Sequence, residues 1–188
     1  MDIKIPFKWI KEYIELNCTA KEFAEKLSLT GPSIEKYKYN ELIDDEVLEI
    51  EVTSNRVDMA SVIGLAREAS AVFGNKADIP EFSIPALKTE DMLPIEVKVL
   101  EPKLCSRFTG IVIKGIEVKE SPLWLKNRLL AIGLNSINNI VDITNYVMVE
   151  YGQPVHAYDY DLISDHKIIV RKSNNESINV LGGKEFKM

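Results

Sequence analysis

The chain has 188 residues, of which 46% are hydrophobic and 28% charged, and its formal net charge is -6. These proportions are typical of a folded globular domain and exclude a chain that is disordered as a whole. The acidic balance argues against binding of nucleic acid by overall positive charge. Cys18 and Cys105 form no C-x-x-C pair, so we expect free thiols, no zinc site and a reducing compartment, the cytoplasm. No apolar run approaches the ~18 residues of a membrane span.

The first part of the chain has the pattern of a small helical module with a pair of strands. Its predicted elements are a helix over 7–16, a short helix opening at Thr19, strands over 33–39 and 46–53, and a helix over 58–73. Thr19 and Glu22 have capping-box spacing, and Leu48, Ile50 and Val52 alternate with polar residues as in a half-buried strand. Asp58 or Ser61 is expected near the cap of the last helix, which Gly74 ends.

Residues 75–94 are the best candidate for a linker, because Pro80, Pro85 and Pro94 interrupt charged and small residues there. We therefore predict two domains, 1–87 and 92–188.

The second part predicts a mixed α/β domain. Its predicted elements are strands over 95–99 and 107–118, a helix with Ser121 as N-cap and Pro122 at its first position, a helix over 138–149, and strands over 167–172 and 177–181. The pattern of 138–149 fits a strand or a helix, and its length and the following Gly152-Gln153-Pro154 favour a helix. Gly182-Gly183 predicts a hairpin turn.

The fold class is therefore α+β, a small helical module followed by an α/β domain. Met188 follows directly on the start of the predicted hairpin, and a strand this short is unusual. We therefore expect the second domain to be truncated.

No nucleotide-binding or metal-binding motif is present, but two polar clusters stand out. The first, 53–58, joins a strand end to a helix start, where an anion is favoured. Arg56 would contact a phosphate or a partner there. The alternative is structural: Asn55 and Asp58 cap the helix, and Arg56 pairs with an acid.

The second polar cluster runs from Asn138 to Asp159 beside apolar residues, so its polar groups must be satisfied by one another or by a ligand. His156 lies in this cluster. A lone histidine is more often structural than catalytic, so the pattern alone leaves both roles open. His166 stands in a polar turn and is expected to be solvated.

These clusters carry a resemblance to a known family. The opening IPFKWIKEYIEL and the stretch EVTSNRVDMASVIGLAREASAVFG are similar to the start of bacterial phenylalanine–tRNA ligase β subunits. The segment CSRFTGIVIKGIEVKESPLWLKNRLLAIGLNSINNIVDITNYVMVEYGQPVHAYD resembles the entry to their editing domain. The resemblance covers essentially the whole chain.

The resemblance implies an (αβ)₂ heterotetramer that attaches phenylalanine to its tRNA with ATP and Mg²⁺. Aminoacylation belongs to the α subunit, and no cofactor is expected on this segment. The editing domain of the β subunit hydrolyses tyrosine wrongly attached to the phenylalanine tRNA. Such editing is needed because an apolar pocket rejects an added hydroxyl by only roughly 10².

Carried over by position, His156 matches the editing-site histidine, and Thr144 and Asn145 match pocket residues. Asn135 stands where the family usually has an arginine, which puts that contact of the editing pocket in doubt. Only Asn40 to Asp45 bridge the place where bacterial members usually insert an oligonucleotide-binding-fold domain that binds tRNA. The glutamate that reads the tyrosine hydroxyl would lie beyond Met188.

The leading interpretation is therefore an N-terminal fragment of a phenylalanine–tRNA ligase β subunit without the inserted domain. We expect it to be inactive alone, because half of the editing pocket is absent. Two alternatives stay open: a freestanding hydrolase that edits mischarged tRNA, and a non-catalytic module for subunit assembly or RNA binding.

Overall fold

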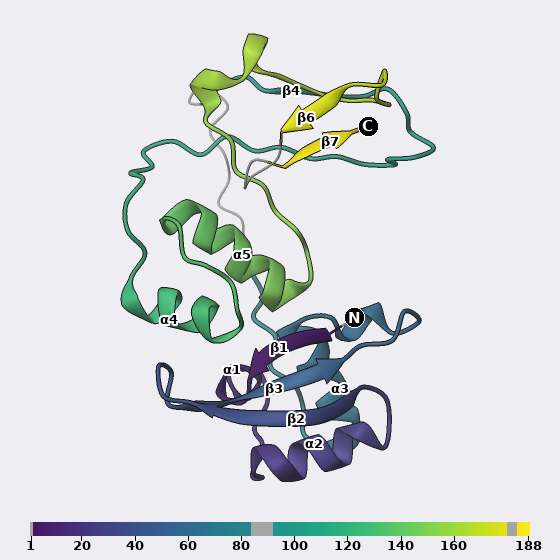
Figure 1. Cartoon of the computed structure of the whole chain (residues 1–188), viewed down its shortest axis with the longest axis vertical. Helices are drawn as coiled ribbons and strands as arrows, with labels where there is room; N and C mark the ends of the chain where they lie inside the picture. The colour runs from purple at the N-terminus through teal and green to yellow at the C-terminus, as the bar shows by residue number, and fades with distance from the viewer. Residues whose placement is uncertain (1, 84–91, 180–183) are drawn as a thin grey trace. The chain divides into compact units, whose positions relative to one another are not determined.

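The computed structural model describes residues 2–83, 92–179 and 184–188 (Figure 1). Two compact units are present, and each is described by itself. The first comprises Met1–Ser83 and Glu117–Ala157, and the second Ile84–Ile116 and Tyr158–Met188. Residues 117–157 thus pack with the N-terminal residues. A compact unit is not the same as a family domain, so the division into 1–87 and 92–188 stays a prediction.

The first unit contains an antiparallel sheet with strand order β1-β3-β2. Its strands are β1 (Asp2–Pro6), β2 (Ser33–Asn40) and β3 (Asp45–Glu51). The predicted pair, β2 and β3, is present, joined by a four-residue turn, but the sheet has a third strand. Ile3 and Ile5 alternate with charged residues in β1, a short signal that the prediction missed.

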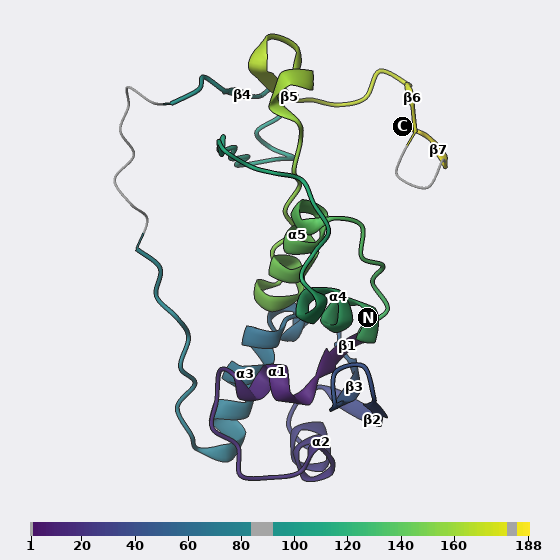
Figure 2. The same cartoon turned by 90° about the vertical axis from the view of Figure 1, so that its left-hand side faces the viewer.

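Three helices lie on one face of this sheet: α1 (Phe7–Lys11), α2 (Ala20–Ser28) and α3 (Val62–Phe73) (Figure 2). The capping box of α2 is confirmed, because the Thr19 and Glu22 side chains each bond the other's backbone N–H. Ser61 caps α3 by accepting from the Gly64 N–H at 3.0 Å. Gly74 ends α3 with φ +77°, as predicted.

The first helix is shorter than predicted, because the chain turns after Lys11. The Tyr13 carbonyl accepts from the Asp78 N–H at 2.7 Å, and Ile14 forms a bridge with Ala77. The Asn75 side chain donates to the Glu15 carbonyl at 2.6 Å. These bonds satisfy the backbone of 13–15 outside a helix, and they make the first part of the predicted linker a packed segment.

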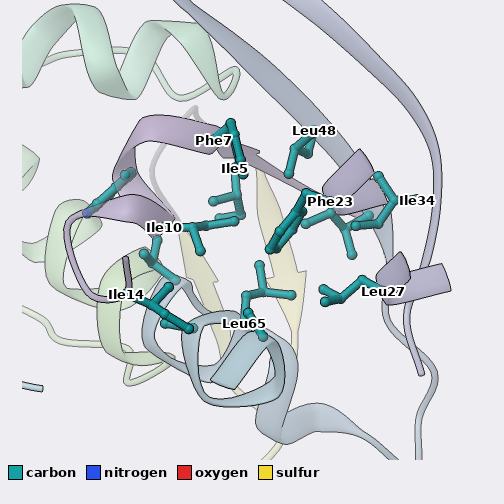
Figure 3. Close-up of a cluster of buried hydrophobic side chains, with 14 of the residues drawn as sticks. Ile5, Phe7, Ile10, Ile14, Phe23, Leu27, Ile34, Leu48 and Leu65 are labelled. Atoms are coloured by element: carbon teal, nitrogen blue, oxygen red, sulfur yellow. The ribbon is translucent and has the colours of Figure 1, made fainter. Parts of the chain in front are cut away.

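The core of the first unit lies between the helices and the sheet (Figure 3). Its labelled side chains come from β1, α1, the segment after α1, α2, β2, β3 and α3 and point toward one another: Ile5, Phe7, Ile10, Ile14, Phe23, Leu27, Ile34, Leu48 and Leu65. Phe23 stacks on Phe73 at 5.7 Å between centroids. Helical and strand periodicities thus converge on one apolar interior.

Two more helices complete the first unit: α4 (Leu123–Ala131) and α5 (Asn139–Tyr151) (Figure 1). The Leu134 N–H bonds the Leu129 carbonyl and the Gly133 N–H bonds the Leu130 carbonyl, a Schellman motif with φ +87° at Gly133. The predicted capping of α4 by Ser121 is wrong. The Ser121 hydroxyl donates to Asp142 instead, and α4 begins after Pro122.

Among its described residues, the second unit contains two separate pairs of strands. Parallel strands β4 (Glu96–Val99) and β5 (Lys167–Val170) form one pair, and antiparallel strands β6 (Ser177–Asn179) and β7 (Glu185–Lys187) form the other. Short 3₁₀ turns η3 (Tyr160–Leu162) and η4 (Ser164–His166) precede β5. The α+β class is confirmed. The predicted turn at Gly182-Gly183 lies outside the described residues.

Two predictions in the second unit are wrong. The stretch 107–118 is no strand, because it finds no partner strand among the described residues; Ile111 and Ile113 remain exposed. His166 is half-buried and not solvated. Its ring stacks on Tyr160 at 4.1 Å, and its Nδ1 is buried without a hydrogen-bond partner.

Within the described ranges, no helix is long and apolar enough to cross a bilayer.

Candidate functional site

The predicted site is built on helix α5, which begins after a strong local cap. The Asn138 side chain accepts from the N–H groups of Ile140 and Val141, both at 3.0 Å. Gly152 ends the helix with φ +74°. The helix interpretation of 138–149 is thereby confirmed, and it places Thr144 and Asn145 on consecutive positions near the middle of α5.

The face of α5 that carries Asp142, Tyr146 and Glu150 is turned toward the rest of the first unit. These residues are spaced by four, and Asp142 and Glu150 are buried at 0% and 8% exposure. At 100° per residue, Thr144 lies about 200° around the helix from Asp142, on the opposite side. Thr144 therefore does not belong to the anchoring face.

The four predicted pocket residues differ in how their side chains are satisfied. Thr144 is half-buried and donates to the Val141 carbonyl at 2.7 Å. Asn135 lies exposed in the loop before α5, and His156 lies exposed after Gly152. For Asn135, Asn145 and His156, no side-chain hydrogen bond is found in the part of the chain that the structure describes. Their polar groups are therefore available to a ligand.

The first half of the second polar cluster is satisfied internally. The Asn139 side chain accepts from the Lys119 N–H at 2.9 Å and donates to the Glu117 carbonyl at 2.9 Å. Asp142 accepts hydrogen bonds from three donors. The cluster thus contains residues that fix the local structure, such as Asn139 and Asp142, and residues whose side chains make no hydrogen bond within the described ranges, Asn145 and His156.

Helix α5 is held to α1 by a buried carboxylate among aromatic rings. Glu150 Oε1 accepts from the Tyr13 hydroxyl and from Trp9 Nε1, the latter at 3.4 Å. Tyr146 stacks on Trp9 at 4.6 Å between centroids. Arg128 of α4 lies over the Trp9 ring at 4.8 Å and bonds Glu12. The helix that carries Thr144 and Asn145 thus rests on the N-terminal residues.

The surroundings at this junction favour a charged Arg128 and neutral side chains of Tyr13 and Tyr146. Burial acts to lower the pKa of Arg128, but its hydrogen bond and ion pair with Glu12 outweigh burial and raise that pKa. Burial, with the hydrogen bond to Glu150 and its charge, raises the pKa of Tyr13. The same causes raise the pKa of Tyr146 to about 12.

The raised pKa of Tyr146 predicts a loss of stability in alkali. The neutral phenol is favoured by folding, so its contribution is complete below about pH 10 and is lost as the pH rises to about 12. The shift of about two units corresponds to roughly 2–3 kcal/mol. We expect the free energy of unfolding to fall less steeply between pH 9.5 and 12 in Tyr146→Phe than in the unsubstituted chain. Equal slopes in urea titrations across this range would contradict the assignment.

Arg56 is bound to two carboxylates. Its guanidinium donates to Asp58 at 3.0 and 3.1 Å and to Glu68 at 2.7 Å. These hydrogen bonds raise the pKa of Arg56, and the bond to Asp58 has the largest effect. In turn, Arg56 holds the pKa of the Asp58 carboxyl below its usual value. Arg56 thus pairs with acids, as the structural alternative predicted. The cap of α3 is Ser61 and not Asn55 or Asp58. A contact of Arg56 with a phosphate or a partner stays a prediction.

A search for metal ligands finds no group of three or more His, Cys, Asp or Glu side chains that could hold an ion, within the described ranges. A shallow cavity of about 470 Å³ lies beside residues 11–17, Lys76 and Asp78. None of the four predicted pocket residues lines it.

Comparison with known proteins finds a family model that matches the second part of the chain. Residues 104–188 match the family model described as the B3/4 domain.

Curated relatives of the chain include phenylalanine–tRNA ligase beta subunits from several bacteria. The chain is 44% identical over 144 residues to that of Carboxydothermus hydrogenoformans, which covers 76% of this chain and 18% of the relative. It is 39% identical over 170 residues to the subunit of Rhodopirellula baltica, a match that covers 89% of this chain and 24% of the relative. It is 38% identical over 167 residues to the subunit of Thermotoga maritima, which covers 88% of this chain and 20% of the relative. The resemblance seen in the sequence is thereby confirmed.

The chain spans 18–24% of the length of these relatives. A crystal structure of an N-terminal fragment of the phenylalanyl-tRNA synthetase beta subunit from Pyrococcus horikoshii has a partial likeness to the fold. The TM-score is 0.47 at 13% identity, covering 100% of this chain and 50% of that one.

Proposed function

We propose that the chain is the N-terminal part of a phenylalanine–tRNA ligase β subunit and forms one wall of its proofreading pocket. The observation that carries this proposal is the 44% identity over 144 residues to such a subunit. The first unit supports it, because Asn135, Asn145 and His156 keep unbonded side chains there, within the described residues.

The reaction is hydrolysis of the ester that joins tyrosine to the 3′ end of the phenylalanine tRNA. The amides of Asn135 and Asn145 and the hydroxyl of Thr144 would hold the terminal adenosine and the ester by hydrogen bonds. His156 would position a water molecule beside the ester carbonyl. The catalysis is mainly positioning and polarisation, because a fixed water gains more from orientation than from a strong base.

The whole enzyme would be an (αβ)₂ assembly in the cytoplasm, with ATP, phenylalanine and the phenylalanine tRNA as substrates. Mg²⁺ would serve aminoacylation on the α subunit. Within the described ranges, no group of three or more His, Cys, Asp or Glu side chains that could hold an ion is found. The editing steps proposed here use only the chain's own polar groups.

Replacement of His156 by alanine in the assembled ligase tests the proposal. Tyrosine release from mischarged phenylalanine tRNA is expected to fall about a hundredfold, with phenylalanine attachment unchanged, because aminoacylation occurs elsewhere. The matched control is His166→Ala, which removes the other histidine, in the second unit. It is expected to leave tyrosine release within about twofold of the unsubstituted enzyme.

The outcomes separate the three interpretations of the chain. Unchanged tyrosine release in His156→Ala would contradict the editing role and favour a non-catalytic assembly or RNA-binding module. Release by the 188-residue chain alone, without the α subunit, would instead favour a freestanding editing hydrolase.

A further inference from the structure

Asp142 is an acid fully buried at the start of helix α5. Its exposed fraction is 0%, and its side chain accepts three hydrogen bonds. Oδ2 accepts from the hydroxyls of Ser121 and Ser136, both at 2.5 Å, and Oδ1 accepts from the Ile137 N–H at 2.9 Å. A carboxylate suits this position, because it accepts several bonds and donates none.

The environment keeps this buried carboxylate ionised. Burial acts to raise the pKa of Asp142, but the hydrogen bonds from Ser121, Ser136 and Ile137 outweigh burial and hold it below its usual value. Asp142 also lies in the first turn of α5, where the helix dipole favours a negative charge. The charge is therefore compensated by short, directional contacts.

The three donors belong to two different segments. Ser121 precedes α4, whereas Ser136 and Ile137 lie in the loop between α4 and α5. That loop carries Asn135, directly before Ser136, and Asp142 itself precedes Thr144 by two residues on the helix. Asp142 thus connects the loop that carries Asn135 to the helix that carries Thr144.

We propose that Asp142 is a positioning residue of the editing site, which fixes Asn135 relative to Thr144 through its bonds to Ser136 and Ile137. This inference rests on the proposed function. Asn135 is exposed and makes no side-chain hydrogen bond of its own within the described chain, so its place depends on the backbone of its loop. The bonds from Ser136 and Ile137 constrain that backbone on the C-terminal side of Asn135, and the bond from the Leu134 N–H to the Leu129 carbonyl constrains it on the other side.

The two serines provide a matched pair of variants. Ser136→Ala and Ser121→Ala each remove one hydroxyl that donates at 2.5 Å to the same carboxylate oxygen, so both weaken the same interaction. Only Ser136 lies in the loop that carries Asn135. These changes disturb the site less than removal of Asp142 would, because the hydrogen bond from the Ile137 N–H to Asp142 stays in place.

Tyrosine release from mischarged phenylalanine tRNA by the assembled ligase distinguishes positioning from a purely structural role. We expect Ser136→Ala to lower kcat/KM about tenfold and Ser121→Ala by less than about twofold, because small displacements of positioning groups cost large rate factors. Asn135→Ala combined with Ser136→Ala should lose no more than Asn135→Ala alone. Amide exchange of 134–138 should be faster in Ser136→Ala only.

Equal losses in the two serine variants, or additive losses in the double variant, would overturn the inference while leaving the proposed function intact. Tyrosine release that is absent from the unsubstituted ligase would overturn the proposed function, and this inference with it.

Discussion

Replacement of Gly64 by alanine is expected to lower the free energy of unfolding by about 3 kcal/mol or more. A Cβ at Gly64 would lie 2.0 Å from the Asp58 carbonyl oxygen and 3.0 Å from Ser61 Oγ. Both neighbours belong to the turn that leads into α3, η1 (Val57–Met59) and its flanking residues. The backbone of Asp58 cannot move aside as a flexible side chain can, so the helix or the turn must shift.

The chain offers a matched control in Gly31→Ala. A Cβ there would meet the ends of the Glu68 and Arg56 side chains at 3.2 and 3.3 Å, and these can move. We expect its free energy of unfolding to stay within about 1 kcal/mol of the unsubstituted chain. Urea denaturation followed by circular dichroism measures both variants. Equal stability of the two would contradict the close approach of Gly64 to Asp58.

Replacement of Glu150 by alanine is expected to cost about 3 kcal/mol of stability. The change leaves the Trp9 indole N–H and the Tyr13 hydroxyl without their acceptor in a buried place, and it opens a cavity. Glu150→Gln keeps one acceptor oxygen and should cost about 1 kcal/mol. Glu15→Gln, at an exposed acid, should change stability by less than about 0.5 kcal/mol.

We expect the free energy of unfolding to be lowest for Glu150→Ala, higher for Glu150→Gln and highest for Glu15→Gln. If Glu150→Ala unfolds at the same urea concentration as Glu15→Gln, the carboxylate does not hold α5 to α1. The described junction would then owe its stability to the Trp9–Tyr146 stack and to the contacts of Arg128 with Trp9 and Tyr146.

Local signals in the sequence predicted much of the fold. The capping box of Thr19 and Glu22, the Gly74 end of α3 and the alternation in β3 depend on residues a few positions apart. Such signals act before tertiary contacts form, so a sequence contains them completely.

Failures of prediction occurred where distant residues compete for the same groups. Asp142 takes the Ser121 hydroxyl that a local rule assigns to the cap of α4. Backbone bonds to 77–78 end the first helix early, although the apolar spacing continues. The β-branched residues of 107–118 fit a strand, but local composition cannot say whether a partner strand is present.

The candidate site depends on two kinds of information. The positions of Asn135, Thr144, Asn145 and His156 came from the family resemblance, because no local motif marks them. The supporting roles of Asp142 and Glu150 became clear only in three dimensions. The two acids of α5, spaced by eight residues and therefore near one face of the helix, were the signal available in the sequence.

The decisive experiment is a crystal structure of the assembled ligase with a stable tyrosyl-adenosine analogue, in which an amide replaces the ester. We expect the analogue to lie against the first unit, with its adenosine and amide in hydrogen-bond contact with Thr144, Asn145 and His156. An analogue bound elsewhere on the β subunit, with these three side chains still free, would contradict this expectation.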